Sequence, residues 1–282
     1  ERAIEEKKLT RYKYYPIVTS LNELELEKYN NLSYEIGKCV IKGKNGKVRL
    51  SERGKILALA RARLVAGAED KIIKLEEYIK PYAEDRHILV YCGATTMLAE
   101  NQERSSTDDE DIRQIDLVTD LLGNKLNMKV SQFTSKEDAN ERMILKNEFE
   151  LGDNLQALIA IKCLDEGVNI PKIKTAFILA STTNPKEYIQ RRGRVLRLAE
   201  NKDYAIIYDF IALPRPLNTV TSITETEMKR DLTLVRNELN RAQEFAHLSM
   251  NMAEAGNVID EIKEVYCIEE NYITYQEDLG YE

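Results

Sequence analysis

Short apolar segments alternate with helical ones between residues 86 and 213, and this alternation restricts the fold more than any other feature of the chain. The apolar segments are rich in β-branched or aromatic residues and lie at residues 87–92, 128–133, 156–161, 175–180 and 204–209. Helical patterns occur between them at residues 112–122, 136–150 and 185–196. Strands that alternate with helices at these spacings form a parallel sheet through right-handed crossovers. We therefore predict an α/β fold whose parallel sheet has helices on both faces.

Helical segments are predicted before and after this region. Residues 12–18 have strand character, and residues 20–23 form a capping-box pattern at the start of a helix that continues towards Gly37. Two further helices are predicted at residues 51–66 and 70–82.

After Pro214 and Pro216, apolar residues recur at alternating steps of four and three, which predicts a helix packed on the rest of the protein. These residues are Met228, Leu232, Val235, Leu239, Ala242 and Ala246. The acidic tail from Asp260 is expected to fray. We divide the chain into a helical extension at 1–85, a central α/β domain at 86–215 and a C-terminal helical extension at 216–282.

Composition places the chain among soluble globular proteins. Of its 282 residues, 43% are hydrophobic and 32% are charged, and no apolar run is long enough to span a membrane. The charged N-terminus does not resemble a signal peptide, so we expect a cytoplasmic protein. The four cysteines and two histidines are too scattered to indicate a structural metal site, and Cys92 and Cys163 are expected to be buried thiols.

An arginine-rich segment at residues 185–197 is the main candidate for a functional site. Asn184 suits the N-cap and Pro185 the first position of a helix, which places Gln190, Arg194 and Arg197 on one face. Guanidinium groups bind phosphate oxygens in a bidentate manner and stay charged, so this face is suited to an anionic ligand. A run of four arginines in seven residues also occurs on ordinary solvated helix faces.

The segments around this helix favour the functional interpretation. Residues 157–161 have the pattern of a buried strand that ends in a polar loop, and the apolar residues 175–180 lead directly into the arginine helix. We expect these to be neighbouring strands whose loops meet in one crevice at the carboxyl edge of the sheet. Residues 134–137 form a capping box after another strand, and the free N–H groups of that helix start are expected to face the same edge.

Charge is unevenly distributed along the chain. The net charge is −7, but residues 38–63 contain nine basic residues and one acid. This stretch is either a phosphate-binding surface or a mobile linker around Lys42, Lys44 and Lys47.

Three motifs resemble those of the second RecA-like domain of superfamily 2 helicases and translocases. Residues 190–197 read Gln-x-x-Gly-Arg-x-x-Arg and are similar to the last motif of that family. Residues 165–171, Asp-Glu-Gly-Val-Asn-Ile-Pro, resemble the preceding motif, and residues 88–92 resemble its first strand motif. The resemblance covers roughly residues 86–212, implies a RecA-like fold, and is nearest to bacterial DEAD/DEAH-type motors of DNA repair or restriction.

The resemblance implies roles for individual residues. Arg194 and Arg197 would contact the γ-phosphate of ATP, with Arg197 as the arginine finger, and Gln190 would position the phosphate or the attacking water. The implied nucleotide-binding residues are Glu166, Gly167, Asn169 and Gly193. The expected nucleic-acid-binding residues are Lys162, Thr134, Ser135, Lys42, Lys44 and Lys47. Asn169 and Lys162 depart from the Asp and Thr-Asp residues that are common in the family.

The sequence contains neither a P-loop pattern nor an Asp-Glu-x-[His/Asp] segment. The resemblance therefore implies that a first RecA-like domain holds the phosphates and Mg²⁺ and acts as this chain's partner, and that this chain alone does not hydrolyse ATP. The predicted function is that of the C-terminal motor domain of an ATP-dependent helicase or translocase that acts on nucleic acid, with DNA favoured over RNA. The alternative is a non-enzymatic RecA-like module that binds nucleic acid or a partner protein.

Overall fold

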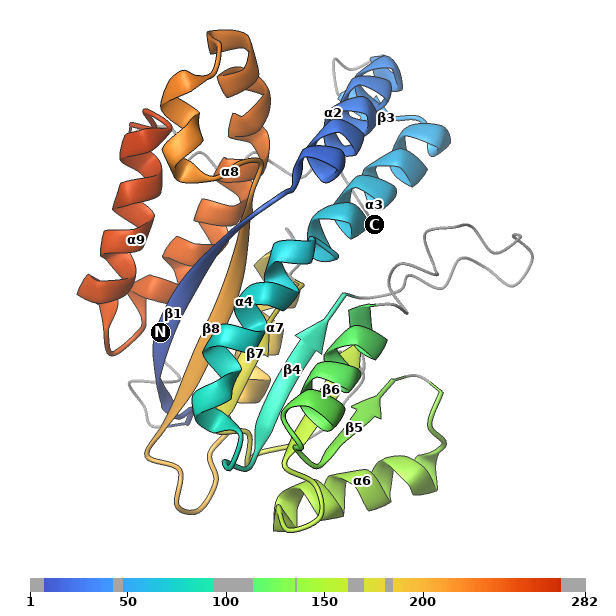
Figure 1. Cartoon of the computed structure of the whole chain (residues 1–282), viewed down its shortest axis with the longest axis vertical. Helices are drawn as coiled ribbons and strands as arrows, with labels where there is room; N and C mark the ends of the chain where they lie inside the picture. The colour runs from blue at the N-terminus through green and yellow to red at the C-terminus, as the bar shows by residue number, and fades with distance from the viewer. Residues whose placement is uncertain are drawn as a thin grey trace.

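The computed structural model describes residues 8–42, 48–93, 114–134, 136–161, 170–180 and 185–269. Its centre is a six-stranded sheet in which every neighbouring pair is parallel (Figure 1), as predicted. In spatial order the strands are β1 (Arg11–Ser20), β8 (Tyr204–Leu213), β7 (Thr175–Ile178), β4 (Ile88–Cys92), β6 (Ala157–Ile161) and β5 (Val130–Phe133). All five strands predicted in the alternating region are therefore confirmed.

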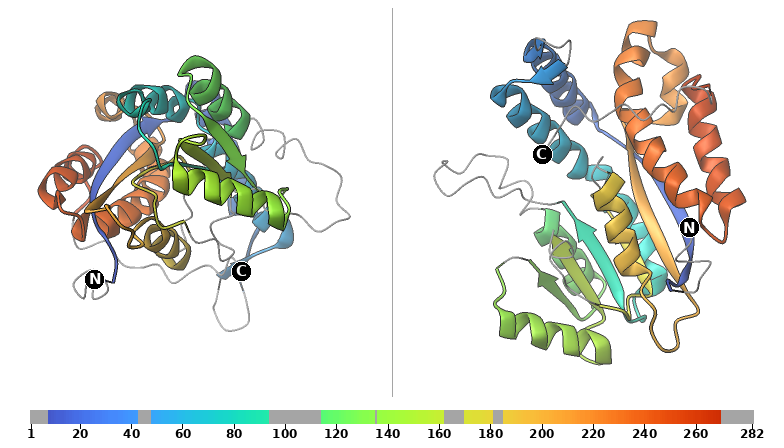
Figure 2. Two further views of the ribbon diagram at one scale, coloured as in Figure 1. Left: turned by 90° about the horizontal axis from the view of Figure 1, so that it is seen from below. Right: turned by 180° about the vertical axis from the view of Figure 1, so that it is seen from behind.

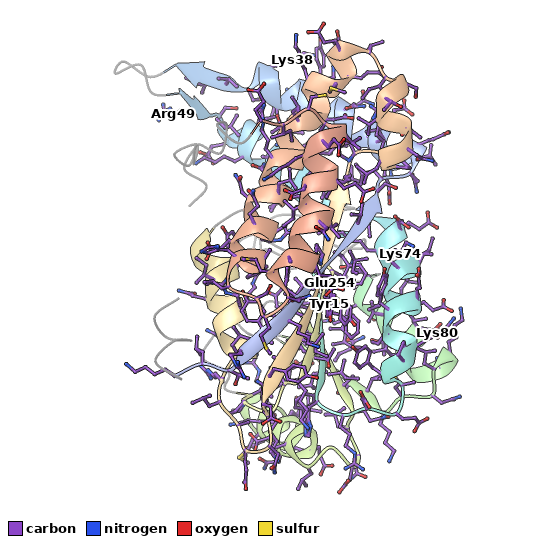
Figure 3. All side chains as sticks on the ribbon, turned by 90° about the vertical axis from the view of Figure 1, so that its left-hand side faces the viewer. Tyr15, Lys38, Arg49, Lys74, Lys80 and Glu254 are labelled. Carbon is purple, nitrogen blue, oxygen red and sulfur yellow. The ribbon has the colours of Figure 1, made fainter. Side chains whose placement is uncertain are left out.

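The predicted strand at residues 12–18 is also confirmed, and it forms an edge of this sheet. Strand β1 pairs with β8 along its whole length, from Arg11 opposite Tyr204 to Ser20 opposite Leu213. The segment before helix α9 (Met252–Val265) covers its outer side, where the Asn251 carboxamide binds both the N–H and the C=O of Tyr14, at 2.8 and 2.9 Å. Figure 3 shows Glu254 of α9 next to Tyr15 on this strand. These contacts protect part of an edge that would otherwise pair with another strand.

Helices cover both faces of the sheet, as predicted (Figure 2). One face packs against α6 (Ala139–Leu151), α7 (Pro185–Val195), α8 (Glu225–His247) and α9. The other face packs against α4 (Glu69–Ile79) and the helical residues 114–120, which continue into a π-helical turn, η2 (Leu121–Lys125). In β4, Leu89 and Tyr91 belong to the first core and Ile88, Val90 and Cys92 to the second, so the strand is buried on both sides.

A helical hairpin extends beyond the carboxyl edge of the sheet (Figure 1). It consists of α2 (Glu23–Lys38) and α3 (Glu52–Ala66), joined through the antiparallel strands β2 (Val40–Lys42) and β3 (Val48–Leu50). Its base is fixed by a small apolar cluster that includes Tyr29, Val65, Ala212 and Leu234. Short helical turns, η1 (Lys80–Tyr82) and η3 (Leu217–Ser222), follow α4 and β8.

Two of the predicted helix starts are wrong. Helix α2 is capped by Asn22, with Glu25 completing the box, because the N–H of Ser20 donates to the carboxylate of Asp70. Helix α6 is capped by Asp138, because the Thr134 capping-box pattern closes a separate turn before the helix.

The C-terminal part of the chain is more ordered than expected. The helix predicted from its four-and-three repeat is α8, which packs against β8 and α9, so its docking on the protein is confirmed. The expected fraying is wrong for residues 260–265, because α9 continues to Val265 with Ile259 and Ile262 buried in the core, and residues 270–282 of the tail lie outside the described part of the chain.

Buried charges also fix α8 on the sheet. Arg241 lies between two carboxylates, at 2.9 Å from Asp209 of β8 and 2.8 Å from Glu238 of its own helix. Tyr14 donates its hydroxyl to Asp209, and Glu238 accepts the N–H of Ala212. All the charges of this cluster are therefore paired and hydrogen-bonded, as buried charges must be.

Candidate nucleotide site on helix α7

Helix α7 runs across one face of the sheet from its carboxyl edge to its amino edge. It begins at Pro185 after β7, as predicted, and Asn184, its expected N-cap, lies outside the described residues. At its far end, the C=O of Leu196 accepts the N–H of Thr10, the residue that precedes β1. Arg197 thus lies level with the amino ends of the strands.

The predicted crevice between neighbouring strands needs correction. Strands β6 and β7 are not neighbours, because β4 lies between them. The chain crosses from one side of β4 to the other between β6 and β7, which makes this the switch point of the sheet. The carboxyl end of β6 therefore lies beside that of β4, and Arg197 is displaced from that edge by the length of α7.

The arginine helix has an inner and an outer side. Tyr188, Arg191, Arg192 and Val195 are buried against the protein, whereas Gln190 is exposed. Arg194 and Arg197 are partly exposed. The burial of Arg191 and Arg192 agrees with their predicted separation from Gln190. The predicted helical face shared by Gln190, Arg194 and Arg197 is wrong for Arg197, because α7 ends at Val195 and Arg197 follows it.

The two inner arginines attach α7 to the rest of the fold. Arg192 donates to the backbone C=O of Glu244 at 3.0 Å and to its carboxylate at 3.1 Å, and its guanidinium lies over the ring of Phe245. Arg191 lies over the ring of Tyr91, with 4.6 Å from Cζ to the ring centre. The sequence alone did not reveal these structural contacts of Arg191 and Arg192.

Gly193 leaves open space on the outer side of the helix. A Cβ atom added there would meet no described atom within 4 Å, so packing among the described residues does not require glycine. Glycine inside a helix costs about 1 kcal/mol relative to alanine. Glycine at this open position leaves the helix backbone accessible to a group outside the described residues.

Lys202 is a residue of this site that the sequence analysis missed. Its ammonium donates to the C=O groups of Pro171, Val195 and Arg197, at 3.0, 2.6 and 2.9 Å. Burial lowers its pKa to about 8. A lysine shortly after a helix can bind the last carbonyls, and this is the weak signal that the sequence contained.

The other predicted site residues are placed only in part. Thr134 directly follows β5, and the carboxylate of Glu137 accepts both its N–H and its hydroxyl, so these donors are not free as expected. Lys42 ends β2, and its side chain lies outside the described part. Outside the described residues lie Glu166, Gly167, Asn169, Lys162, Ser135, Lys44 and Lys47, as does Cys163.

The basic stretch at residues 38–63 is only partly a charged surface. Arg63 is buried, and Lys38 and Arg53 both pair with Glu35. Lys38 and Arg49 lie at the outer end of the helical hairpin (Figure 3). The local excess of positive charge on the surface is therefore smaller than the sequence suggests.

No helix in the described part of the chain combines the length and apolar character needed to cross a membrane. Among the same residues, no three His, Cys, Asp or Glu side chains are grouped as a metal site would require.

Comparison with known proteins identifies the domain that carries α7. Residues 70–199 match the helicase conserved C-terminal domain. A protein of Sulfolobus islandicus filamentous virus (isolate Iceland/Hveragerdi), named "Putative helicase 22", is 37% identical over 83 residues, which are 29% of this chain and 14% of the viral protein. The chain thus corresponds to a small part of that relative.

Solved structures agree with the fold. The Sulfolobus solfataricus SWI2/SNF2 ATPase core in complex with dsDNA superposes with a TM-score of 0.50 at 12% identity, over 85% of this chain and 50% of that one. The C-terminal domain of a Sulfolobus solfataricus SWI2/SNF2 ATPase superposes with a TM-score of 0.47 at 11% identity, over 78% of this chain and 97% of that one. Residues 70–199, which contain β4 to β7 of the parallel sheet and helix α7, are therefore similar to the helicase conserved C-terminal domain.

Proposed function

We propose that this chain is the C-terminal motor domain of an ATP-dependent nucleic-acid helicase or translocase. In this proposal the outer side of α7 completes an ATP site whose other half is a first RecA-like domain. The observation that carries the proposal is the separation of roles on α7, where Arg191 and Arg192 are buried against the fold while Gln190 is exposed and Arg194 is partly exposed beside the open position of Gly193. A helix whose outer side only faces solvent has no need of glycine at position 193.

The chemistry of the outer side fits a phosphate. Arginine stays protonated at any physiological pH and binds phosphate oxygens through two parallel hydrogen bonds. Arg197, as the proposed arginine finger, would stabilise the charge that develops at the γ-phosphate, while Arg194 binds the same group. Gln190 would orient the phosphate or the attacking water. Mg²⁺ bound with ATP would neutralise phosphate charge, and its ligands are expected on the first domain.

Residues at the carboxyl edge would complete the nucleotide site and contact the nucleic acid. Glu166, Gly167 and Asn169 are proposed to lie near the ribose. Closing and opening of the cleft between the two domains would move the protein along the strand. We propose DNA as the substrate rather than RNA, and the structural neighbour that was solved with dsDNA supports this choice.

The nucleotide site is tested in the protein that joins this chain to its first RecA-like domain. Arg197→Ala should lower kcat by roughly 10³-fold, as is typical for an arginine finger. Gly193→Ala should stabilise the isolated chain by about 0.5–1 kcal/mol because it improves helix propensity, and should still reduce ATP hydrolysis because the methyl group occupies the space left for the partner. Full ATP hydrolysis by both variants would show that α7 takes no part in the ATP site, which leaves this chain the role of a binding module.

The nucleic-acid contact is tested through its salt dependence. Replacing Lys42, Lys44 and Lys47 with Gln should flatten the log–log salt slope of DNA binding by about two to three units if all three contact phosphate. Lys74 on α4 and Lys80 at the start of η1 are the control positions, since Figure 3 shows them away from the hairpin end. An unchanged slope in the triple variant would show that the loop is an ordinary solvated linker, leaving Lys162, Thr134 and Ser135 as candidates.

A further inference from the structure

Lys202 is buried at the point where the arginine helix ends. Its side chain comes from the short connection before β8, and the residue is only 8% exposed. An ammonium group has three donors. All three are used here, since its nitrogen lies 2.6 Å from the C=O of Val195, 2.9 Å from that of Arg197 and 3.0 Å from that of Pro171.

These bonds join two segments that are distant in the sequence. Val195 and Arg197 belong to the end of α7, where the last carbonyls of a helix have no partner within the helix. Pro171 lies shortly before β7. Lys202 therefore fixes the end of the arginine helix relative to the segment that leads into β7 through one charged group.

A second contact holds the backbone of Arg197 from another side. The hydroxyl of Thr10 donates to the C=O of Arg197 at 3.2 Å, and the N–H of Thr10 donates to the C=O of Leu196 at 2.7 Å. The backbone of Arg197 is thus hydrogen-bonded by Thr10, the residue before β1, on one side and by Lys202 on the other.

We infer that Lys202 is a positioning residue for Arg197, setting the place of its guanidinium by holding the carbonyls of residues 195 and 197. This inference rests on the proposed role of Arg197 as arginine finger. Lys202 does not reach the nucleotide itself, because its three donors point to backbone carbonyls. A displacement of about 1 Å at a catalytic group reduces the rate by roughly 10²-fold.

The test uses Lys202→Met in the protein that contains both RecA-like domains. Methionine keeps most of the side-chain volume and removes all three donors. We expect kcat for ATP hydrolysis to fall by roughly 10- to 100-fold while KM for ATP changes less than threefold. The matched control is Lys172→Met, since Lys172 is close by and donates to the C=O of Glu150 in α6 instead of to α7. It should retain at least half of the activity.

A double-mutant cycle separates positioning from a general structural role. If Lys202 acts through Arg197, Lys202→Met should have no further effect on kcat in the Arg197→Ala background. Multiplicative losses in the double variant, or an unchanged kcat in Lys202→Met, would overturn the inference while leaving the role of Arg197 intact. Unchanged kcat in Arg197→Ala alone would instead overturn the proposed function.

A second variant covers the case in which Lys202→Met does not fold. Lys202→Gln keeps two donors and should retain more activity than a variant with none. Circular dichroism and thermal unfolding of the 282-residue chain show whether each variant folds. A Gln variant that folds with wild-type kcat and with wild-type hydrogen exchange at the Thr10 amide would also contradict the inference.

Discussion

Replacing Arg192 separates the structural arginines of α7 from those proposed to act on ATP. Arg192→Met removes a guanidinium that joins α7 to α8 through the backbone C=O and the carboxylate of Glu244 and lies 5.0 Å from the ring centre of Phe245. Methionine retains much of the apolar contact. The variant therefore tests the polar contacts of Arg192 at one defined position.

The expected loss follows from these contacts. The hydrogen bond from the Arg192 guanidinium to the partly buried C=O of Glu244 contributes about 1.5–3 kcal/mol to the free energy of unfolding. The pair with the Glu244 carboxylate contributes less, about 1 kcal/mol, because that side chain is 32% exposed and solvent screens it. The cation–π contact adds about 1 kcal/mol. Apolar packing by methionine offsets part of the sum, so we expect a net loss of about 2–4 kcal/mol.

Urea denaturation of the isolated chain measures this loss from the shift in midpoint at constant m-value. Gln190→Ala is the control on the same helix, since Gln190 is exposed and its removal should change stability by less than about 0.5 kcal/mol. A loss below about 1 kcal/mol for Arg192→Met, or equal losses at both positions, would refute the inner and outer division of α7.

Three further results are expected. Arg241→Met should lower the free energy of unfolding by about 3–5 kcal/mol at pH 7, because it leaves the buried carboxylates of Asp209 and Glu238 without their cationic partner; urea denaturation measures the loss, and a loss below about 1 kcal/mol would contradict it. Burial lowers the pKa of Lys71 and Lys202 from 10.5 to about 8, so these lysines bind more protons in the unfolded chain than in the folded one between pH 8 and 9.5. The free energy of unfolding of the wild-type chain should therefore rise by roughly 1.5 kcal/mol per lysine over this range. A free energy of unfolding that stays constant or falls with pH would contradict this expectation. Cys92 should resist thiol reagents until the chain unfolds, because burial raises the pKa of its thiol and keeps the reagent away from the sulfur. Mass spectrometry of the labelled chain locates the cysteines that have reacted.

Local sequence pattern was sufficient for most of the secondary structure. Strands such as β4 and β6 are short apolar runs between helical patterns, and their composition already favours a buried parallel sheet. Helix α7 begins at Pro185 as predicted, and its 3.6-residue period separates Gln190 and Arg194 from Arg191 and Arg192. These features depend on neighbours within a few residues, which the sequence shows directly.

Competing local signals could not be resolved in the same way. Residues 20–23 and 22–25 both have capping-box spacing, and the helix starts at the second because Ser20 remains in β1 and binds Asp70, 50 residues away. At residues 134–137 the box forms as a turn, and Asp138 caps the helix instead. In each case the residue that starts the helix was decided by the hydrogen-bond partner that one polar group finds in the folded chain.

The proposed site shows the same division. The sequence by itself determined the arginine motif, its helix and the face shared by Gln190 and Arg194. Tertiary structure decided that β4 separates β6 from β7, that Arg192 binds α8, and that Lys202 holds the end of α7. The physical reason is that periodicity and capping act over one or two helical turns, whereas strand order and buried polar contacts depend on which distant segments the folded core brings together.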